Sequence, residues 1–517
     1  MFAIRRFHLS IPSHLSRKFP VGRAMSTQAS KLGANHTAMK NLTIDRINPH
    51  IRQVEYAVRG ELAIRAEQLK QDLVRGELPF KEIVNCNIGN PQQLQQKPIT
   101  FFRQVASLVE YPELLLPENR DKVSALYPSD AIERAALLLQ HIGNIGAYSH
   151  SQGIPHIRQN VSRFIEDRDG HPANPDHIFL TQGASAGVQM ILQLLVEHSN
   201  VGIMIPTPQY PLYSATLAQV GARAVPYFLE EEQGWGLSVE ELQRSLEKAR
   251  NEGADVRALC IINPGNPTGQ CLTADNMREI IDLCRRERLV LLADEVYQTN
   301  IYAPQTRPFH SFKRIVRDMG ADDVELFSFH SISKGMIGEC GRRGGYFECV
   351  GIDNRVLEEI YKIASVSLCP NVQGQIMVDL MVNPPKKNDP SFALYDKEIR
   401  GIYESLKRRS KRLCELFNRL EGVTCNDAEG AMYLFPQVQL PEGAIRAAKE
   451  ANRQPDEFYC LKMLEATGVC VVPGSGFGQK AGTWHFRSTF LPPEHQFDAF
   501  CGLLEDFHRN FMDKYRV

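Results

Sequence analysis

The sequence lacks the features that mark several protein classes. It has no run of about 18 uninterrupted apolar residues, so no membrane-spanning helix is indicated. Its twelve cysteines include no C-x-x-C pair, which disfavours a zinc site or a disulfide framework and favours reduced thiols in an intracellular compartment. The formal net charge is −1 and there is no long basic block, so nothing marks a nucleic-acid-binding surface. With 43% hydrophobic and 23% charged residues, the composition is that of a folded soluble protein.

Acidic residues are also missing from the N-terminus, where the first is Asp45. The segment before it combines apolar residues and serines with the basic residues Arg5, Arg6, Arg17, Lys18 and Arg23. This Arg-rich, Ser-rich and acid-free profile is typical of a mitochondrial presequence, to which we assign residues 1–30. A disordered basic tail is the alternative interpretation. The leader predicts the mitochondrial matrix, whereas a second start at Met25 would give a cytosolic form.

The chain of 517 residues is too long for one small core, which favours two domains. In its middle part, apolar runs alternate with helical patterns; the runs cover residues 177–180, 201–205, 224–228, 258–262, 289–293 and 324–327. Such alternation predicts crossover units and a mostly parallel sheet flanked by helices, an α/β fold. Ligands of such sheets bind at the carboxyl ends of the strands.

Helical patterns and one linker organise the rest of the chain. Residues 54–73 predict a helix, and Thr273 is expected to cap another whose apolar face begins at Met277. Residues 383–390, rich in proline and asparagine, are the clearest linker. Beyond it, residues 397–420 predict a long charged helix, and a smaller α+β unit follows.

Small and polar residues follow the first predicted strands. Residues 181–187 (TQGASAG) open a helix, whose free N–H groups and dipole favour a phosphate dianion. A Gly-rich turn of this kind is weak evidence by itself. Tyr210 and Tyr213 follow the next strand, where they form a packing cluster or one of them stacks on a flat ring.

The later strands end in amide, carboxyl and amine groups. Residues 263–269 (NPGNPTG) form an extended turn with outward amide side chains, because each Asn precedes a proline. Asp294 ends the next apolar run. An aspartate so placed can bind Mg²⁺, but no second carboxylate supports that interpretation, and a pyridinium nitrogen would also satisfy a buried carboxylate. Lys334 then lies among the hydroxyls of residues 328–335 (SFHSISKG), although most lysines at strand ends are only solvated charges.

The motifs NPGNPTG, ADEVY and SxSKG…GRRGG, in this order, resemble the fold-type I aminotransferases, which use pyridoxal 5′-phosphate. In addition, EIVNCNIGNPQQLQQKPITFFRQV, GAYSHSQGIPHIRQ and WHFRSTFLP closely resemble the alanine aminotransferases (glutamate–pyruvate transaminases). The resemblance implies a large cofactor-binding domain with a mostly parallel seven-stranded sheet flanked by helices, plus a smaller α+β domain built from N- and C-terminal segments. We place an N-terminal arm with part of the small domain at residues 31–115, the large domain at residues 116–385 and the C-terminal small domain at residues 386–517.

The resemblance also implies roles for individual residues. Lys334 would form the Schiff base with the cofactor aldehyde, and Asp294 would keep the ring nitrogen protonated. Tyr297 and Asn266 would hydrogen-bond the ring oxygen, and Tyr210 would stack on the ring face. The phosphate would be held by Ala184, Ser185, Ser331, Ser333 and Arg342, with Arg343 as the less favoured alternative to Arg342.

Substrate and subunit contacts are implied in the same way. Arg487 would bind the substrate α-carboxylate as a bidentate pair, with Asn266 beside it. Gly89 would line the substrate mouth next to Asn87, where only a small residue lets the ligand approach. Tyr148 matches a tyrosine that reaches the neighbouring subunit's phosphate, which implies a homodimer with shared active sites; core packing is the alternative. No metal is expected.

The expected reaction is a ping-pong transamination with Lys334 as general base, in which L-alanine and 2-oxoglutarate give pyruvate and L-glutamate. An aromatic or 2-aminoadipate aminotransferase, or another fold-type I enzyme such as a cyclopropane-forming synthase, is the alternative on the same fold. A non-catalytic binding protein is the second alternative, which the intact Lys334, Asp294 and Asn266 disfavour.

Overall fold

The computed structural model of the protein describes residues 42–76 and 78–516; the predicted presequence and Met25 lie outside them. The chain divides into two compact units between Ile47 and Asn48, and the elements below all belong to the second unit. Its α-helices are α1 (Glu61–Leu73), α2 (Thr100–Glu110), α3 (Arg120–Leu126), α4 (Ser129–Ile142), α5 (Pro155–Asp169), α6 (Ala184–Leu195), α7 (Leu212–Val220), α8 (Val239–Asn251), α9 (Ala274–Glu287), α10 (Phe312–Asp318), α11 (Asn354–Val366), α12 (Val372–Val382), α13 (Phe392–Phe417), α14 (Glu442–Glu450), α15 (Pro455–Thr467) and α16 (Phe497–Tyr515). Within the described ranges, no helix is both long and apolar enough to cross a membrane.

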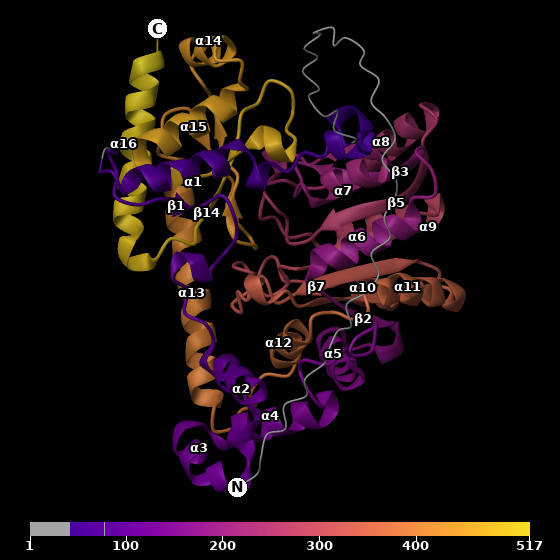
Figure 1. Ribbon diagram of the computed structural model, residues 1–517. Helices are drawn as coiled ribbons and strands as arrows, with labels where there is room; N and C mark the ends of the chain where they lie inside the picture. The colour runs from indigo at the N-terminus through magenta and orange to yellow at the C-terminus, as the bar shows by residue number, and fades with distance from the viewer. Residues whose placement is uncertain (1–41, 77, 517) are drawn as a thin grey trace, which may run out of the picture. The chain divides into compact units, whose positions relative to one another are not determined.

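Seven strands form the central sheet: β2 (Ile178–Thr181), β3 (Val201–Thr207), β4 (Arg223–Phe228), β5 (Asp255–Ile262), β6 (Val290–Asp294), β7 (Leu326–Ser331) and β8 (Gly345–Val350). Their order across the sheet is β2-β8-β7-β6-β5-β3-β4. Neighbouring strands run parallel except at β8, which is antiparallel to both β2 and β7. The sheet, seen in Figure 1, confirms the predicted mostly parallel seven-stranded α/β fold.

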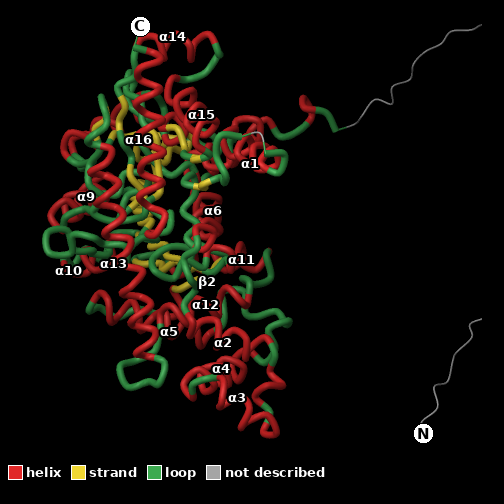
Figure 2. Tube along the Cα trace, turned by 90° about the vertical axis from the view of Figure 1, so that its left-hand side faces the viewer, coloured by secondary structure: helices red, strands yellow, loops and turns green. Residues whose placement is uncertain are grey.

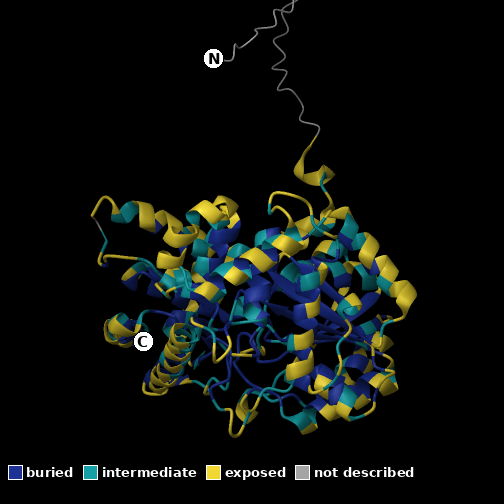
Figure 3. Cartoon of the chain, turned by 90° about the horizontal axis from the view of Figure 1, so that it is seen from below, coloured by how far each residue is buried: buried dark blue, intermediate teal, exposed yellow. Residues whose placement is uncertain are grey.

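Helices cover both faces of this sheet. Val188 of α6, Leu217 of α7 and Ile360 of α11 belong to one hydrophobic cluster, and apolar residues of α8, α9 and α10 belong to another. Because side chains alternate along a strand, Cys260 of β5 packs in the first cluster and Ile261 in the second. Figure 2 shows α6 and α11 on one side of the strands and α9 and α10 on the other. The strands are accordingly the buried centre in Figure 3.

Capping residues set where several of these helices begin. Thr273 accepts a hydrogen bond from the backbone N–H of Asn276 at 3.2 Å and starts α9, as predicted. Ser238 and Ser311 cap α8 and α10 in the same way. These caps fix the helices that follow the loops at the ends of the sheet.

Two predicted helices have different bounds in the structure. The helix expected over residues 54–73 begins only at Glu61, because the chain first makes a 3₁₀ turn at Ala57–Arg59 and then has an extended backbone at Gly60. The helix expected over residues 397–420 is α13, which begins and ends a few residues earlier. The predicted linker precedes it, between α12 and α13.

Segments from both ends of the chain pack together beside the sheet. The short strands there are β1 (Val84–Asn85), β9 (Val423–Thr424), β10 (Tyr433–Leu434), β11 (Gln437–Val438), β12 (Val469–Cys470), β13 (Val472–Pro473) and β14 (Phe486–Thr489). β1 pairs in parallel with β12. Leu62 of α1 shares a hydrophobic cluster with Leu464 of α15 and Leu504 of α16, and these three helices stand together in Figure 1. The N-terminal helix is therefore part of a core that the C-terminal helices complete.

Candidate active site

The carboxyl ends of the central strands bring several predicted site residues together. Asp294 is the last residue of β6 and pairs with Ile262 of β5 and Phe329 of β7. Ser331 ends β7, and Asn266 lies in the turn after β5. Since these strands run parallel, their polar end groups meet at one edge of the sheet.

Asp294 is a buried carboxylate with 4% exposure. Tyr213 donates its hydroxyl to Oδ2 at 3.0 Å, and the N–H of Val296 donates to Oδ1 at 3.4 Å. Burial raises the pKa of Asp294 from 3.8 to about 6, although the hydrogen bond from Tyr213 opposes this shift. Among the residues that the structure describes, no cation forms an ion pair with this carboxylate. A protonated ring nitrogen would supply the missing charge.

Lys334 follows β7, and its amine faces a segment from the N-terminal part of the chain. Nζ donates to the carbonyl of Gly89 at 2.7 Å and lies 3.5 Å from the hydroxyl of Tyr433. A Cβ atom at position 89 would collide with Tyr433 Oη and lie 2.8 Å from Lys334 Nζ. The close approach therefore requires glycine at this position.

Arg487 lies on β14 and is 1% exposed. Its Nη1 donates to Oδ1 of Asn266 at 2.9 Å and its Nη2 donates to the carbonyl of Asn87. The guanidinium lies 4.1 Å from the ring centre of Tyr433 and 4.6 Å from that of Phe477. Nε is buried without a hydrogen-bond partner, and no carboxylate of the described residues pairs with this cation. A buried cation without a counter-ion is unfavourable, so the position suits an anionic ligand.

Two tyrosines connect these groups. Tyr297 donates to the hydroxyl of Tyr433 at 3.0 Å and lies 3.5 Å from Nδ2 of Asn266. Burial raises the pKa of Tyr297 well above its ordinary value. Burial also acts to raise the pKa of Tyr433, but the positive charges of Lys334 and Arg487 outweigh it and the pKa is lowered. Tyr433 is therefore the more acidic hydroxyl of the pair.

Tyr210 lies after β3 and meets the N-terminal segment. Its hydroxyl shares a hydrogen bond with that of Tyr56, and the two rings are edge-to-face with centroids 6.1 Å apart. Burial raises the pKa of Tyr210 well above its ordinary value. The contact ties residues from before α1 to the ligand edge of the sheet.

The start of α6 and the end of β7 form the predicted phosphate corner. Ala184 and Ser185 stand in the first turn of α6, after Gly183, whose φ is +79°. Ser331 and Ser333 are both buried, and the Ser331 hydroxyl accepts a hydrogen bond from the N–H of Ser333 at 3.3 Å. Backbone N–H groups and hydroxyls are the donors that a phosphate requires.

The two adjacent arginines have different partners. Arg342 Nη1 lies 3.5 Å from the side-chain oxygen of Gln373. Arg343 donates to the carbonyls of Cys340 and Gln182, each at 3.0 Å. The structure thus brings Arg343, rather than the preferred Arg342, into hydrogen-bond contact with the turn before α6.

Tyr148 is exposed, whereas the other predicted site residues are buried or half-buried. Its side chain is 79% exposed. In the part of the chain that the structure describes, no group of three or more His, Cys, Asp and Glu residues is arranged to hold a metal ion. The site is therefore made of amine, carboxylate, hydroxyl and guanidinium groups.

These groups fit pyridoxal 5′-phosphate. The Asp294 carboxylate is buried and forms no ion pair with a cation of the described residues, which suits a protonated pyridine nitrogen. The first turn of α6 and two buried serines offer N–H and hydroxyl groups to a phosphate. Lys334 supplies a primary amine for an aldehyde. No residue of this set contradicts the cofactor that the motifs implied.

Three tyrosines of the site were not assigned from the sequence. Tyr433 lies in a strand of two residues, which has no periodicity to detect. Tyr56 lies within the helix predicted over residues 54–73, where it counted as an apolar residue and not as a site residue. Tyr213 stands three positions after Tyr210, within one helical turn, and that spacing was the available indication of a second ring at the strand end.

The family profile described as "Aminotransferase class I and II" matches residues 117–503. The chain therefore belongs to the class I and II aminotransferases, and its cofactor is pyridoxal 5′-phosphate. This assignment agrees with the motifs at the strand ends and with the geometry around Lys334.

Individual relatives narrow the comparison. The chain is 55% identical to "Probable alanine aminotransferase, mitochondrial" of Dictyostelium discoideum, covering 93% of this chain and 91% of that protein. It is 51% identical to "Glutamate--glyoxylate aminotransferase 2" of Arabidopsis thaliana, covering 92% and 98%. A solved structure of an alanine aminotransferase from Pyrococcus furiosus superposes with a TM-score of 0.70 at 22% identity, covering 90% of this chain and all (100%) of that one, which shows the shared fold.

Proposed function

We propose that the protein transfers the amino group of L-alanine to 2-oxoglutarate, giving pyruvate and L-glutamate in a ping-pong reaction. The observation that carries the proposal is the buried Arg487, which has no counter-ion among the described residues and lies close to the ring of Tyr433, whose hydroxyl is 3.5 Å from Lys334 Nζ. A carboxylate bound there would bring the α-carbon of an amino acid near the amine. The names of relatives such as the Dictyostelium protein support alanine as the donor.

The residues that would hold the cofactor follow from their chemistry. Asp294 would pair with the ring nitrogen, Tyr297 and Asn266 would hydrogen-bond the ring oxygen, and Tyr210 would lie on the ring face. The phosphate would be held by Ala184, Ser185, Ser331, Ser333 and one of the arginines Arg342 and Arg343. When bound, the cofactor supplies an aldehyde for the amino group and a protonated ring that accepts electrons from the α-carbon.

The chain's own residues would bind the substrate and move the proton. Arg487 would orient the amino acid through two parallel hydrogen bonds to its carboxylate, and Gly89 would leave space for it. Lys334 Nζ, held by the Gly89 carbonyl, would take the α-proton as general base and return it later as general acid. The hydroxyl of Tyr433 would stabilise whichever protonation state the amine has, since it can donate or accept.

We also propose a homodimer in which Tyr148 reaches the cofactor phosphate of the partner. Support comes from its 79% exposure and from the exposed Val366 and Leu368, at 85% and 52%. Ser151, three positions after Tyr148, donates to the carbonyl of Leu368 at 2.7 Å, so the two exposed segments are neighbours. Sedimentation of the holoenzyme at the mass of two chains is the expected result.

The small domain and the leader complete the proposal. The pairing of β1 with β12 supports a small domain that combines residues 386–517 with part of residues 31–115, which also include the N-terminal arm, beside the large domain at residues 116–385. The acid-free leader and the word mitochondrial in the names of several relatives support import into the matrix, with a cytosolic form from Met25. Fractionation of cells that express the full-length chain would test both locations.

A coupled assay for pyruvate with alanine and 2-oxoglutarate tests the main proposal. The relative named for glutamate and glyoxylate, at 51% identity, makes glyoxylate the second acceptor to include. We expect turnover with alanine and 2-oxoglutarate to exceed turnover with glutamate and glyoxylate. The reverse order would replace the proposed function with the second one, and preference for an aromatic donor would refute both.

A further inference from the structure

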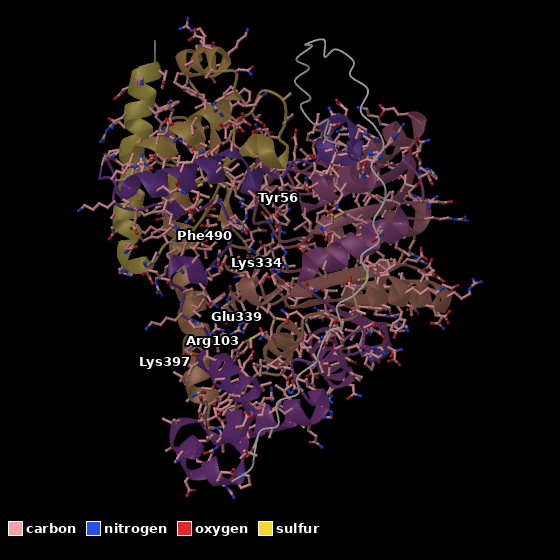
Figure 4. The ribbon with its side chains drawn as sticks, viewed as in Figure 1. Tyr56, Arg103, Lys334, Glu339, Lys397 and Phe490 are labelled. Carbon is pink, nitrogen blue, oxygen red and sulfur yellow. The ribbon has the colours of Figure 1, made fainter. Side chains whose placement is uncertain are left out.

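The loop that carries Lys334 is in contact with a segment of the chain to which the proposed reaction gives no role. Residues 332–342, here the lysine loop, run from the end of β7 to Arg342. Residues 90–103 (NPQQLQQKPITFFR), here the clasp, include the first turn of α2. Figure 4 shows Lys334, Glu339 of the lysine loop and Arg103 of the clasp in succession.

The central contact is a pair of charges. Glu339 is 3% exposed, and both of its carboxylate oxygens face Arg103 Nη2, at 2.9 and 3.1 Å. The same Nη2 donates to the side-chain oxygen of Gln92 at 3.0 Å. Gln92 in turn donates its Nε2 to the carbonyl of Gly338 at 3.1 Å, next to Glu339. The four residues close a ring of hydrogen bonds between the clasp and the lysine loop.

Two further contacts extend the grip along the loop. Gln96 donates its Nε2 to the carbonyl of Met336 at 3.0 Å, and the thiol of Cys340 donates to the side-chain oxygen of Asn90 at 3.2 Å. A Cβ atom at Gly338 would lie 3.0 Å from Gln96 Nε2, so the clasp packs directly against the loop backbone. Side chains of the clasp therefore satisfy carbonyls that the loop itself leaves unpaired.

The loop needs this support because its own backbone is permissive. Gly335 and Gly338 both have positive φ, +68° and +62°, a conformation in which glycine is least restricted. The clasp, by contrast, stands on a rigid base, since Phe102 and Val105 of α2 are fully buried in a cluster with α4, α5 and α12. Glu339 also links the two ends of the loop, because its N–H donates to the Ile332 carbonyl and its carbonyl accepts from Arg342.

We propose that the clasp positions the lysine loop, with Arg103, Gln92 and Glu339 as positioning residues that hold the Lys334 amine at its working distance. The inference rests on the proposed transamination for its kinetic consequence. Its structural consequence, restricted motion of residues 335–342, does not depend on any substrate. A misplacement of about 1 Å at a reacting group lowers a rate by roughly 100-fold.

The decisive variant is Arg103→Met in the full-length holoenzyme, compared with Arg134→Met as a matched control. Arg134 also lies in this helical region, over the ring of Phe101, and pairs with a fully buried carboxylate, that of Asp379, but it does not touch the lysine loop. We expect Arg103→Met to lower kcat per bound cofactor about 100-fold while KM for alanine changes less than about threefold. Hydrogen–deuterium exchange of residues 335–342 should rise in this variant only. Arg134→Met should lower the melting temperature and leave kcat and that exchange unchanged.

Gln92→Met keeps the proposal testable if Arg103→Met does not fold, because it removes two of the ring's hydrogen bonds without exposing a buried charge. It should lower kcat about tenfold and raise the same amide exchange, consistent with a partial misplacement of the amine. Unchanged exchange in residues 335–342 with Arg103→Met or Gln92→Met, or an equal kcat loss in Arg134→Met, would overturn the proposal. If the wild type makes no pyruvate from alanine, the proposed function is wrong. The amide exchange of residues 335–342 in the variants then tests by itself whether the clasp positions the lysine loop.

Discussion

Asp294 and Lys334 stand on or directly after long strands of the central sheet, whereas Tyr433 and Arg487 lie on strands of two and four residues. The first side, the sheet side, is fixed by ladders of backbone hydrogen bonds with helices packed on both faces. The second, the short-strand side, is fixed by buried side chains that come from far apart in the chain, such as Asn87 beside Arg487. In the proposed function, the sheet side carries the proton-transferring amine and the carboxylate for the ring nitrogen, and the short-strand side carries the guanidinium for the substrate carboxylate.

We expect the largest effect on activity when the Lys334 amine is removed from the sheet side. Lys334→Ala should lower kcat by at least about 10⁴-fold in the pyruvate assay, because the general base is removed, while the cofactor still binds through the remaining groups. Lys362→Ala, which removes an exposed lysine paired with Glu359, is the control and should retain full activity. Substantial turnover by Lys334→Ala would show that the essential amine lies elsewhere.

On the short-strand side, Arg487→Lys should lower kcat/KM for alanine about 100-fold, mostly through KM. A lysine keeps the positive charge but cannot form two parallel hydrogen bonds to a carboxylate. Arg409→Lys serves as the matched control, since Arg409 is also buried and donates to the carbonyls of Leu491 and Pro492, away from the site. If both variants have the same KM, the buried guanidinium at 487 does not bind the substrate.

The raised pKa of Asp294 gives a prediction for the protein without cofactor. Well below pH 3.8 this carboxyl is protonated in both the folded and the unfolded chain, so it has no effect. As the pH rises from 3.8 to about 6, the carboxyl ionises in the unfolded chain while the fold keeps it protonated, so stability is lost, and above about pH 6 the loss is complete. From 3.8 to about 6, the loss relative to Asp294→Asn is about 3 kcal/mol in the free energy of unfolding.

Denaturant unfolding of both cofactor-free proteins between pH 4 and pH 7 measures this difference. The two stability curves should diverge as the pH rises, and they should do so less in the loaded wild type, where a ring cation compensates the carboxylate. Parallel curves for the cofactor-free pair would mean that Asp294 is ionised without cost, and that the sheet side does not store an unpaired charge.

We expect the smallest effect on activity from a substitution that separates the two contacts of Tyr433, its hydroxyl next to Lys334 and its ring against Arg487. Tyr433→Phe removes the hydroxyl next to Lys334 but keeps the aromatic face against Arg487. We expect kcat to fall about tenfold, the effect of about one hydrogen bond to a charged group, while KM for alanine changes less than about twofold. A rise in KM with unchanged kcat would assign Tyr433 to substrate binding alone.

The sheet side could be predicted from the sequence because its logic is local. Continuous apolar runs predicted the strands, and the residue after each run was necessarily at the ligand edge, as Asp294 shows. Helix caps could be predicted for the same reason, because a cap such as Thr273 depends only on the residues next to it in the sequence. The start of α1 was predicted wrongly because the apolar pattern continues through a 3₁₀ turn that only Gly60 interrupts.

The short-strand side depends on contacts that no local pattern encodes. Tyr433 meets Gly89 and Lys334, which lie 344 and 99 positions before it, and its strand is too short to show alternation. Arg487 was assigned by resemblance, and only the fold reveals that no carboxylate in the described part of the chain pairs with it. The grip of Arg103 on Glu339 likewise joins two segments whose sequences carry no common periodicity.

The antiparallel direction of β8 determines which groups the connection after β7 brings to the ligand edge of the sheet. A parallel return from β7 would require a crossover, usually a helix, to the other end of the sheet. Because β8 is antiparallel to β7, the connection over residues 332–344 stays at the ligand edge and carries both Lys334 and the Arg342–Arg343 pair. One connection between two hydrogen-bonded strands therefore delivers both the amine and the guanidinium groups to the same edge of the sheet.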